Sequence, residues 1–233
     1  AQSEQCITKS TAKGVIGMSN LGVLTQGAMH AIDLFEKAGY EVITFHAIGA
    51  GGDAMEQMMK EGIINAVFDY GLGEIADGVW GVLRAGGPNR LTVAGKLGLP
   101  QVIVPGGSEH LGILVNEPSK VPAGYEDHQI PWHSPYVFVP RLNAEEQARV
   151  AKTIGEKLVH STKDTLFLMP LKGVSSYSAE GGELYNPGLD AAYWESLQKE
   201  LPDTIEVESM SNNAQDDVFV ERAVSYLIDK LEN

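Results

Sequence analysis

Short apolar runs alternate with longer stretches of helical spacing along most of this chain. The runs have the length of β-strands and lie at residues 14–18, 41–46, 63–70, 101–105, 136–140, 165–170 and 204–207. Between these runs, apolar side chains recur every three or four positions, as in an amphipathic helix. This spacing covers residues 23–38, 74–83, 144–160, 189–201 and 220–231, one stretch that starts at residue 53 and one that ends at residue 97. This alternation predicts an α/β fold of the Rossmann-like, doubly wound kind, with a mainly parallel sheet and helices on both faces.

Local signals refine this organisation. Asp53, followed three positions later by Glu56, resembles a capping box and predicts that Asp53 caps the second helix. Residues 116–135 contain several prolines and show no periodicity. A loop of that length is usually functional, so we expect it to cover a site or to contact another subunit. We expect residues 1–12 to be a flexible leader and residues 13–233 to form a single α/β domain.

Turns rich in glycine or small polar residues follow several predicted strands. Their sequences are MSNLG, AIGAGGD, DYGLGE, PGGSEH and LKGVSSYS. Turns at the carboxyl ends of parallel strands share one edge of the sheet, and ligands bind there where the strand order reverses. In EVITFHAIGAGG, the order strand, glycine turn, helix lets backbone N–H groups approach an anion at the helix N-terminus. The sequence therefore predicts a small-molecule ligand, an anionic metabolite or a nucleotide, at this edge.

The candidate ligand contacts are residues of these turns together with one nearby arginine. They are Ser19, Asn20, His46, Gly49, Gly51, Gly52, Gly71, Glu74, Arg90, Gly107, Ser108, Ser175 and Ser176. Arg90 is the candidate anion clamp because a guanidinium can donate two parallel hydrogen bonds to a phosphate or carboxylate; a salt bridge to a neighbouring acid is the alternative. His46 is the candidate catalytic acid or base, and a buried core histidine is its alternative. Asp53 argues against a phosphate at its own helix, and favours a neutral or hydroxyl-bearing group there, because its carboxylate would repel an anion.

Composition and charge narrow the possible partners. The 233 residues are 43% hydrophobic and 21% charged, which is enough for a full core. The net charge of -14 argues against binding to nucleic acid or to an anionic membrane. The single cysteine, Cys6, can form no internal disulfide and fits a cytoplasmic protein, and no apolar run has membrane-spanning length. Because the first residue is Ala1, we expect a processed product or one half of something longer.

Several histidines and serines invite a catalytic interpretation. His110, His128 and His133, with Glu109 and Asp127, could act as metal ligands, but their spacing matches no compact motif, so we expect a site without metal. The candidate serines lie outside any G-x-S-x-G sequence. Hydroxyl contacts to a ligand are therefore favoured over a serine nucleophile.

The order of several motifs resembles the second half of a two-domain protein family. The motifs are HAIGAGGDAME, FDYGLGEIADGVWGVLRAGGPNRL, GLPQVIVPGG, VPRLNAEE and PLKGVSSYSAEGGELYNPGLDAAYWESL. That family includes the tomato mosaic virus resistance protein of plants, and its bacterial members are labelled Tm-one-like ATP-binding proteins. The resemblance implies a Rossmann-type domain that works with a first half, to which nucleotide binding mainly belongs. Ile48 and Ala50 stand where the family usually has threonine, which argues against a hydroxyl contact to phosphate at this turn.

Three functions remain open at this point. The first is a small-molecule-binding domain that works with a separate nucleotide-binding half, through which any nucleotide cofactor would act. The second is an enzyme acting on a phosphorylated or carboxylated metabolite, with His46 as acid or base and Arg90 as the anion clamp. The third is an oligomerisation domain, in which the long loops would form the contact between copies of the chain.

Overall fold

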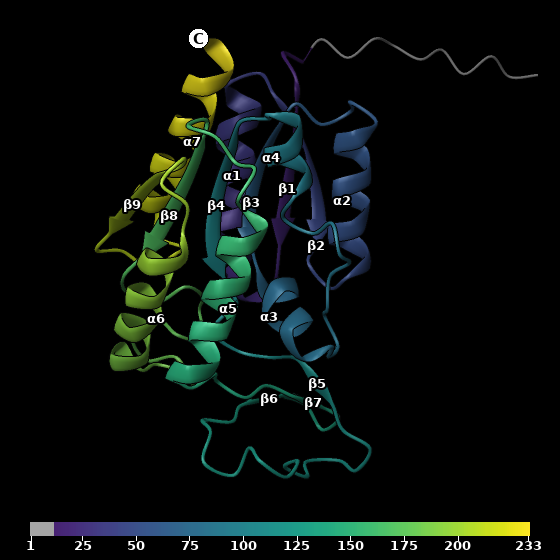
Figure 1. Cartoon of the computed structure of the whole chain (residues 1–233), viewed down its shortest axis with the longest axis vertical. Coiled ribbons are helices and arrows are strands. Elements are labelled where there is room, and N and C mark those ends of the chain that lie inside the picture. The colour runs from purple at the N-terminus through teal and green to yellow at the C-terminus, as the bar shows by residue number, and fades with distance from the viewer. Residues whose placement is uncertain (1–11) are drawn as a thin grey trace, which may run out of the picture.

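Six parallel strands form the central sheet of the computed structural model, which describes residues 12–233 (Figure 1). The predicted leader, residues 1–12, lies outside the described residues apart from Ala12. The strand order is β2-β1-β3-β4-β8-β9. The strands are β1 (Val15–Asn20), β2 (Glu41–His46), β3 (Ala66–Gly71), β4 (Gln101–Gly106), β8 (Thr165–Pro170) and β9 (Glu206–Met210).

Helices cover both faces of this sheet, which confirms the predicted Rossmann-like doubly wound fold (Figure 1). Neighbouring residues of a strand point to opposite faces. Phe68 accordingly packs in the core cluster under α1 and α7, whereas Val67 packs in the cluster under α2 and α4. The helices are α1 (Thr25–Lys37), α2 (Ala50–Lys60), α3 (Gly73–Trp80), α4 (Val93–Leu97), α5 (Ala144–Lys157), α6 (Pro187–Glu200) and α7 (Asp217–Glu232), with a 3₁₀ turn, η1 (Gly22–Leu24), before α1.

The strand order reverses at β1, which lies between β2 and β3. From β1 the chain enters α1, whose residues pack in one core cluster; from β3 it enters α3, whose residues pack in the cluster of the opposite face. The two connections therefore diverge at the carboxyl ends of neighbouring strands. Open α/β sheets bind ligands in the crevice that forms at such a point.

A small antiparallel sheet lies beyond this carboxyl edge (Figure 1). Its strands are β5 (Ile113–Leu114), β7 (Val137–Phe138) and β6 (Trp132–Ser134), in that order. Residues 113–139, here termed the flap, have their own apolar contacts, with the rings of Tyr125 and Trp132 each 5.3 Å from that of Phe138. The prediction that residues 136–140 form a strand of the parallel sheet is therefore wrong. A short apolar run does not reveal which sheet it joins.

The start of α2 also differs from its prediction. This helix begins at Ala50, its N-cap is Gly49 with φ 90°, and Asp53 lies inside the first turn, where its carboxylate accepts from the Gly87 amide at 3.2 Å. A capping box is present at α5, between Asn143 and Glu146. Across residues 12–233, no helix combines the length and the apolar character that crossing a membrane requires.

Candidate functional site

A pocket of about 610 Å³ opens at the carboxyl ends of the strands, beneath the flap. It is formed by turns that follow β1, β2, β4 and β8, so four of the five predicted glycine turns contribute to it. Its lining residues are Leu21, Gly22, Val23, His46, Ile48, Leu83, Arg84, His110, Leu111, Gly112, His133, Val137, Val139, Ser176 and Tyr177. Its size falls within the range of pockets that bind small organic molecules.

His46 is the predicted catalytic candidate, and it does line the pocket. It is the last residue of β2 and is exposed, which excludes the alternative of a core histidine. Its Nδ1 lies 3.3 Å from the carbonyl oxygen of Asn20. A carbonyl can only accept, so Nδ1 carries a proton, and in the neutral form of the ring Nε2 is then a hydrogen-bond acceptor. Among residues 12–233, no hydrogen-bond partner occupies Nε2.

Ser176 is the other predicted contact that lines the pocket. Its backbone N–H donates to the Val23 carbonyl at 3.0 Å and so joins the turn after β8 to the turn after β1. The side chain is exposed, and within the described part of the chain its hydroxyl has no hydrogen-bond partner. This hydroxyl is therefore available to a ligand.

Arg84 is the arginine of the pocket wall, and its charge is already paired. The carboxylate of Asp77 accepts from Arg84 Nε at 3.0 Å and from Nη2 at 2.8 Å. The same guanidinium donates to the His110 carbonyl at 2.7 Å, and Nη1 lies 3.1 Å from His110 Nε2. Because Arg84 can only donate, Nε2 of His110 accepts and the ring proton is on Nδ1. His110 is thus fixed by Arg84, unlike His46.

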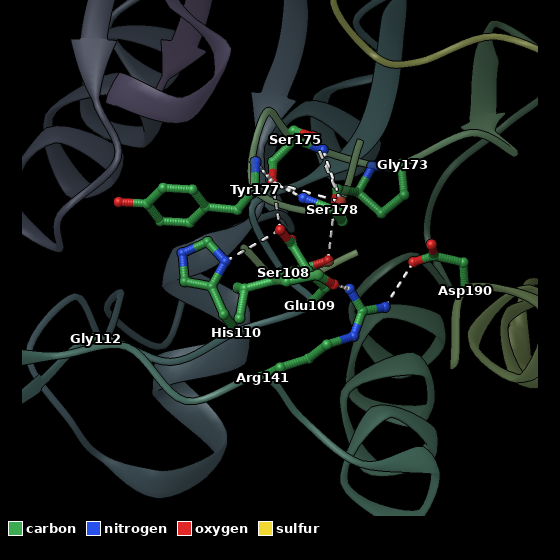
Figure 2. Close-up of polar contacts among 12 residues, drawn as sticks. Ser108, Glu109, His110, Gly112, Arg141, Gly173, Ser175, Tyr177, Ser178 and Asp190 are labelled. Carbon is green, nitrogen blue, oxygen red and sulfur yellow. Dashed lines mark hydrogen bonds and ion pairs between the residues drawn. The ribbon is translucent and has the colours of Figure 1, made fainter. Parts of the chain in front are cut away.

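Glu109 is fully buried. Its carboxylate lies between the ring of His110 and the hydroxyl of Ser175 (Figure 2). Its Oε1 accepts from the hydroxyl of Ser175 and lies 3.2 Å from His110 Nδ1, outside hydrogen-bond geometry. Burial alone would raise the pKa of Glu109, but the nearby N–H of His110, the hydrogen bond from Ser175 and the charge of Arg141 act in the opposite direction and lower the pKa. The hydroxyl of the predicted contact Ser175 is therefore committed to an internal carboxylate.

The prediction that Arg90 reaches toward a ligand needs correction. Its side chain is fully buried. Nη1 and Nη2 donate to the two oxygens of Asp69 at 2.5 and 2.6 Å, Nε donates to Glu74 at 2.5 Å, and Nη2 also donates to the Gly71 carbonyl at 3.2 Å. Burial alone would lower the pKa of Arg90, but Asp69 and then Glu74 raise it above its usual value. Arg90 therefore forms salt bridges to neighbouring acids, which was the alternative to its role as an anion clamp.

The glycine turn before α2 is likewise closed by the protein itself. Glu74 is buried, and its Oε1 accepts from the amides of Gly49 at 2.5 Å and Gly52 at 3.1 Å. A Cβ on Gly51 would overlap the His46 carbonyl oxygen, and one on Gly52 would overlap Glu74 Oε2. These glycines therefore allow close packing of the turn. The predicted place for an external anion is held by the carboxylate of Glu74.

The remaining predicted contacts are not among the described lining residues of the pocket. Ser19 is buried, donates to Asp69 at 2.6 Å and accepts from the Gly71 amide at 2.9 Å. Ser108 is buried against Pro105 and Tyr193. Of the three other predicted contacts, Asn20 is partly buried, and Gly71 and Gly107 are buried. The turns converge as predicted, but most of their polar side chains hold the turns together.

Sequence reasoning missed several pocket residues. Arg90 was predicted because it lies in a glycine- and proline-rich turn, Arg84 was not considered, and His110 and His133 were considered only as metal ligands. Across residues 12–233, no group of three or more His, Cys, Asp or Glu side chains is arranged to hold a metal ion. The apolar lining residues Leu83 and Val137 carried no signal, because they resemble ordinary core positions.

Comparisons with known proteins identify relatives of this chain. The model of the "Uncharacterised protein family (UPF0261) C-terminal domain" matches residues 13–231. A UPF0261 protein of Clostridium tetani is 37% identical over 221 residues, which cover 94% of this chain and 54% of that protein. The ToMV resistance protein Tm-1(GCR237) of Solanum lycopersicum is 30% identical over 200 residues, which cover 85% of this chain and 26% of that protein. The chain thus spans about half the length of the bacterial relative.

Proposed function

Because the chain belongs to the UPF0261 family, whose C-terminal domain it matches, we propose that it binds a small organic molecule in the pocket beneath the flap. The observation that supports this proposal is the position of the pocket. A cavity of about 610 Å³ lies at the point where the strand order reverses, between turns from four strands. Turns that served only to connect strands to helices would not be expected to surround a cavity of this size.

The same proposal assigns nucleotide binding to another part of the full protein. The amides of Gly49 and Gly52 already hold Glu74, so the α2 N-terminus offers little to a phosphate chain. The chain spans about half of its bacterial relatives, which leaves room for a partner half. A homo-oligomer is the other partner expected, and the flap has exposed apolar side chains at Leu114 and Tyr136.

The test combines ligand identification with a variant that blocks the pocket. Purified protein is analysed by native mass spectrometry, followed by a thermal-shift screen of the molecules that are found. Leu83→Trp adds bulk to the pocket wall, and Leu97→Trp is the matched control, since Leu97 is a similarly exposed leucine on α4 that is not among the described lining residues. A ligand should be lost from the first variant and retained by the second. Equal retention by both variants would remove the basis for a pocket ligand.

An enzyme is the second candidate, and the geometry of His46 favours it. Nδ1 lies 3.3 Å from the Asn20 carbonyl, which leaves Nε2 as the proton-accepting atom of the neutral ring, and the residue lines the pocket. A general base needs this arrangement. His46→Asn keeps a donor for the carbonyl but removes the proton-accepting ring nitrogen. If the domain is an enzyme, turnover of the identified ligand should be lost with little change in its affinity, whereas a pure binding domain would show a change in affinity alone.

A further inference from the structure

We propose, on the basis of the ligand-binding function above, that the pocket takes an uncharged and largely apolar molecule whose hydroxyl group donates a hydrogen bond to His46 Nε2. This goes beyond the proposed function because it names the chemical class of the ligand. It also replaces the anionic metabolite or nucleotide expected at this edge of the sheet with a neutral molecule. Three independent features of the pocket carry the inference.

The first feature is that the pocket lining contributed by residues 12–233 contains no uncommitted arginine or lysine. Arg84 is the arginine of that lining, and it is paired with Asp77 through two hydrogen bonds. Arg90 is buried against Asp69 and Glu74. A phosphate group buried without a cation partner loses its hydration and gains no compensating charge. The net charge of -14 adds repulsion at long range.

The second feature is the apolar wall. Ile48 and Leu83 are 48% and 45% exposed, and both line the pocket. From the flap, Val137 and Val139 add two β-branched side chains, and Leu111 lies between β4 and the flap. Exposed apolar side chains that line a cavity are stabilised by contact with an apolar ligand, because that contact removes them from water. Such a wall fits an aromatic or branched aliphatic body.

The third feature is the tautomer of His46. Its Nδ1 lies 3.3 Å from the Asn20 carbonyl, which can only accept, so in the neutral ring the acceptor is Nε2. An acceptor selects a ligand with an O–H or N–H group, and it repels a carboxylate or phosphate oxygen. The hydroxyl of Ser176 lies in the same pocket and can accept from or donate to the same ligand group. Together these groups favour a hydroxyl at the polar end of the ligand.

A matched set of probes tests this inference. The compounds are 2-naphthol, 2-methoxynaphthalene and 2-naphthyl phosphate, which share one aromatic body and differ in a single group. Binding to the whole chain is measured by ligand fluorescence or calorimetry at neutral pH. We expect 2-naphthol to bind about 2- to 10-fold more tightly than the methyl ether, as one net hydrogen bond predicts. The phosphate should bind at least tenfold more weakly than 2-naphthol.

Replacement of His46 identifies the partner of the hydroxyl. His46→Phe keeps an aromatic ring at the end of β2 but removes the acceptor nitrogen. In this variant the preference for 2-naphthol over the ether should disappear, while affinity for the ether stays within about twofold. His30→Phe is the control, because His30 lies on α1, away from the pocket lining.

The outcomes separate this inference from the proposed function. Tightest binding of the phosphate, with loss in Leu83→Trp, would leave the proposed pocket function intact but overturn the neutral-ligand class. A hydroxyl preference that survives in His46→Phe would overturn the role of His46. If none of the probes binds, while a ligand recovered from the purified protein is lost in Leu83→Trp, the ligand class is wrong and the pocket function stands. If no molecule of any kind depends on Leu83, both proposals fail.

Discussion

Replacing Arg90 with leucine should cost this protein a large part of its folding stability. Arg90 is fully buried and forms ion pairs with Asp69 and Glu74 at 2.5 Å each, with Glu56 at 3.7 Å. Arg90→Leu has a suitable volume but leaves these carboxylates without their cation. The perturbation therefore strands buried negative charge and creates little empty space.

The expected magnitude follows from the burial of both partners. Removing one partner of a buried ion pair typically costs about 3–5 kcal/mol, because the other charge stays buried and unpaired. A domain with a total stability of about 5–15 kcal/mol would lose a large fraction of it. Arg222→Leu is the matched control. Arg222 pairs with Glu208 on the surface, where both side chains are 36% exposed, and such pairs contribute about 0–1 kcal/mol.

Urea denaturation followed by circular dichroism measures both variants. The cost of Arg90→Leu should also depend on pH in a definite direction. A carboxyl group that has lost its cation binds its proton more tightly in the folded than in the unfolded state, so this variant should lose stability as the pH rises. Its deficit is then smaller at pH 5 than at pH 8. A deficit below about 1 kcal/mol, equal to that of Arg222→Leu, would refute the reasoning.

Two further predictions concern the same turns. Burial raises the pKa of Glu56 to about 7, although Arg90 opposes this shift. The stability that this group contributes is therefore complete below the pKa that Glu56 has in the unfolded chain, and it is lost as the pH rises to about 7. The difference in unfolding free energy between wild type and Glu56→Gln should therefore fall by roughly 3 kcal/mol over that window, and a flat difference would contradict the assignment. Gly52→Ala should destabilise by about 1–3 kcal/mol, because its Cβ would overlap Glu74 and lie 2.6 Å from Arg90 Cδ. Gly78→Ala is the control: Gly78 lies in α3, an added Cβ there would have nothing within 4 Å, and the change should stabilise the protein by about 0.5–1 kcal/mol. Equal shifts of the melting temperature in the two variants would show that a side chain at residue 52 meets no steric overlap.

The sequence predicted most of the fold because buried strands and amphipathic helices leave periodic patterns. The bounds of β2 and β8 are as predicted, and the C-terminal stripe is α7. The predictions were wrong where a short sequence pattern has its structural partner far away in the sequence. Residues 136–140 are apolar enough for a strand, yet β7 pairs with β5 and β6. Likewise Asp53 has a capping sequence, yet Glu74 holds the amides of that helix turn.

The candidate site was predicted at the level of turns and only partly at the level of residues. Parallel strands bring their carboxyl-end turns together wherever the chain places them, so convergence follows from the fold class. Which side chains point into the pocket depends on pairing across the turns. Ser19, Ser108 and Ser175 are all taken by internal acceptors, whereas His46 and Ser176 remain exposed. No spacing rule distinguishes these two cases.

The carboxylate of Glu74 has a consequence for how the domain meets the metabolites around it. A free phosphate would compete for the Gly49 and Gly52 amides according to its concentration, but Glu74 is part of the same chain and is held there by Arg90. A group attached to the same chain acts at an effective concentration that is set by geometry and does not change with the composition of the solution. The conformation of this turn, and with it the position of His46, should therefore stay the same in phosphate-rich and phosphate-poor solution.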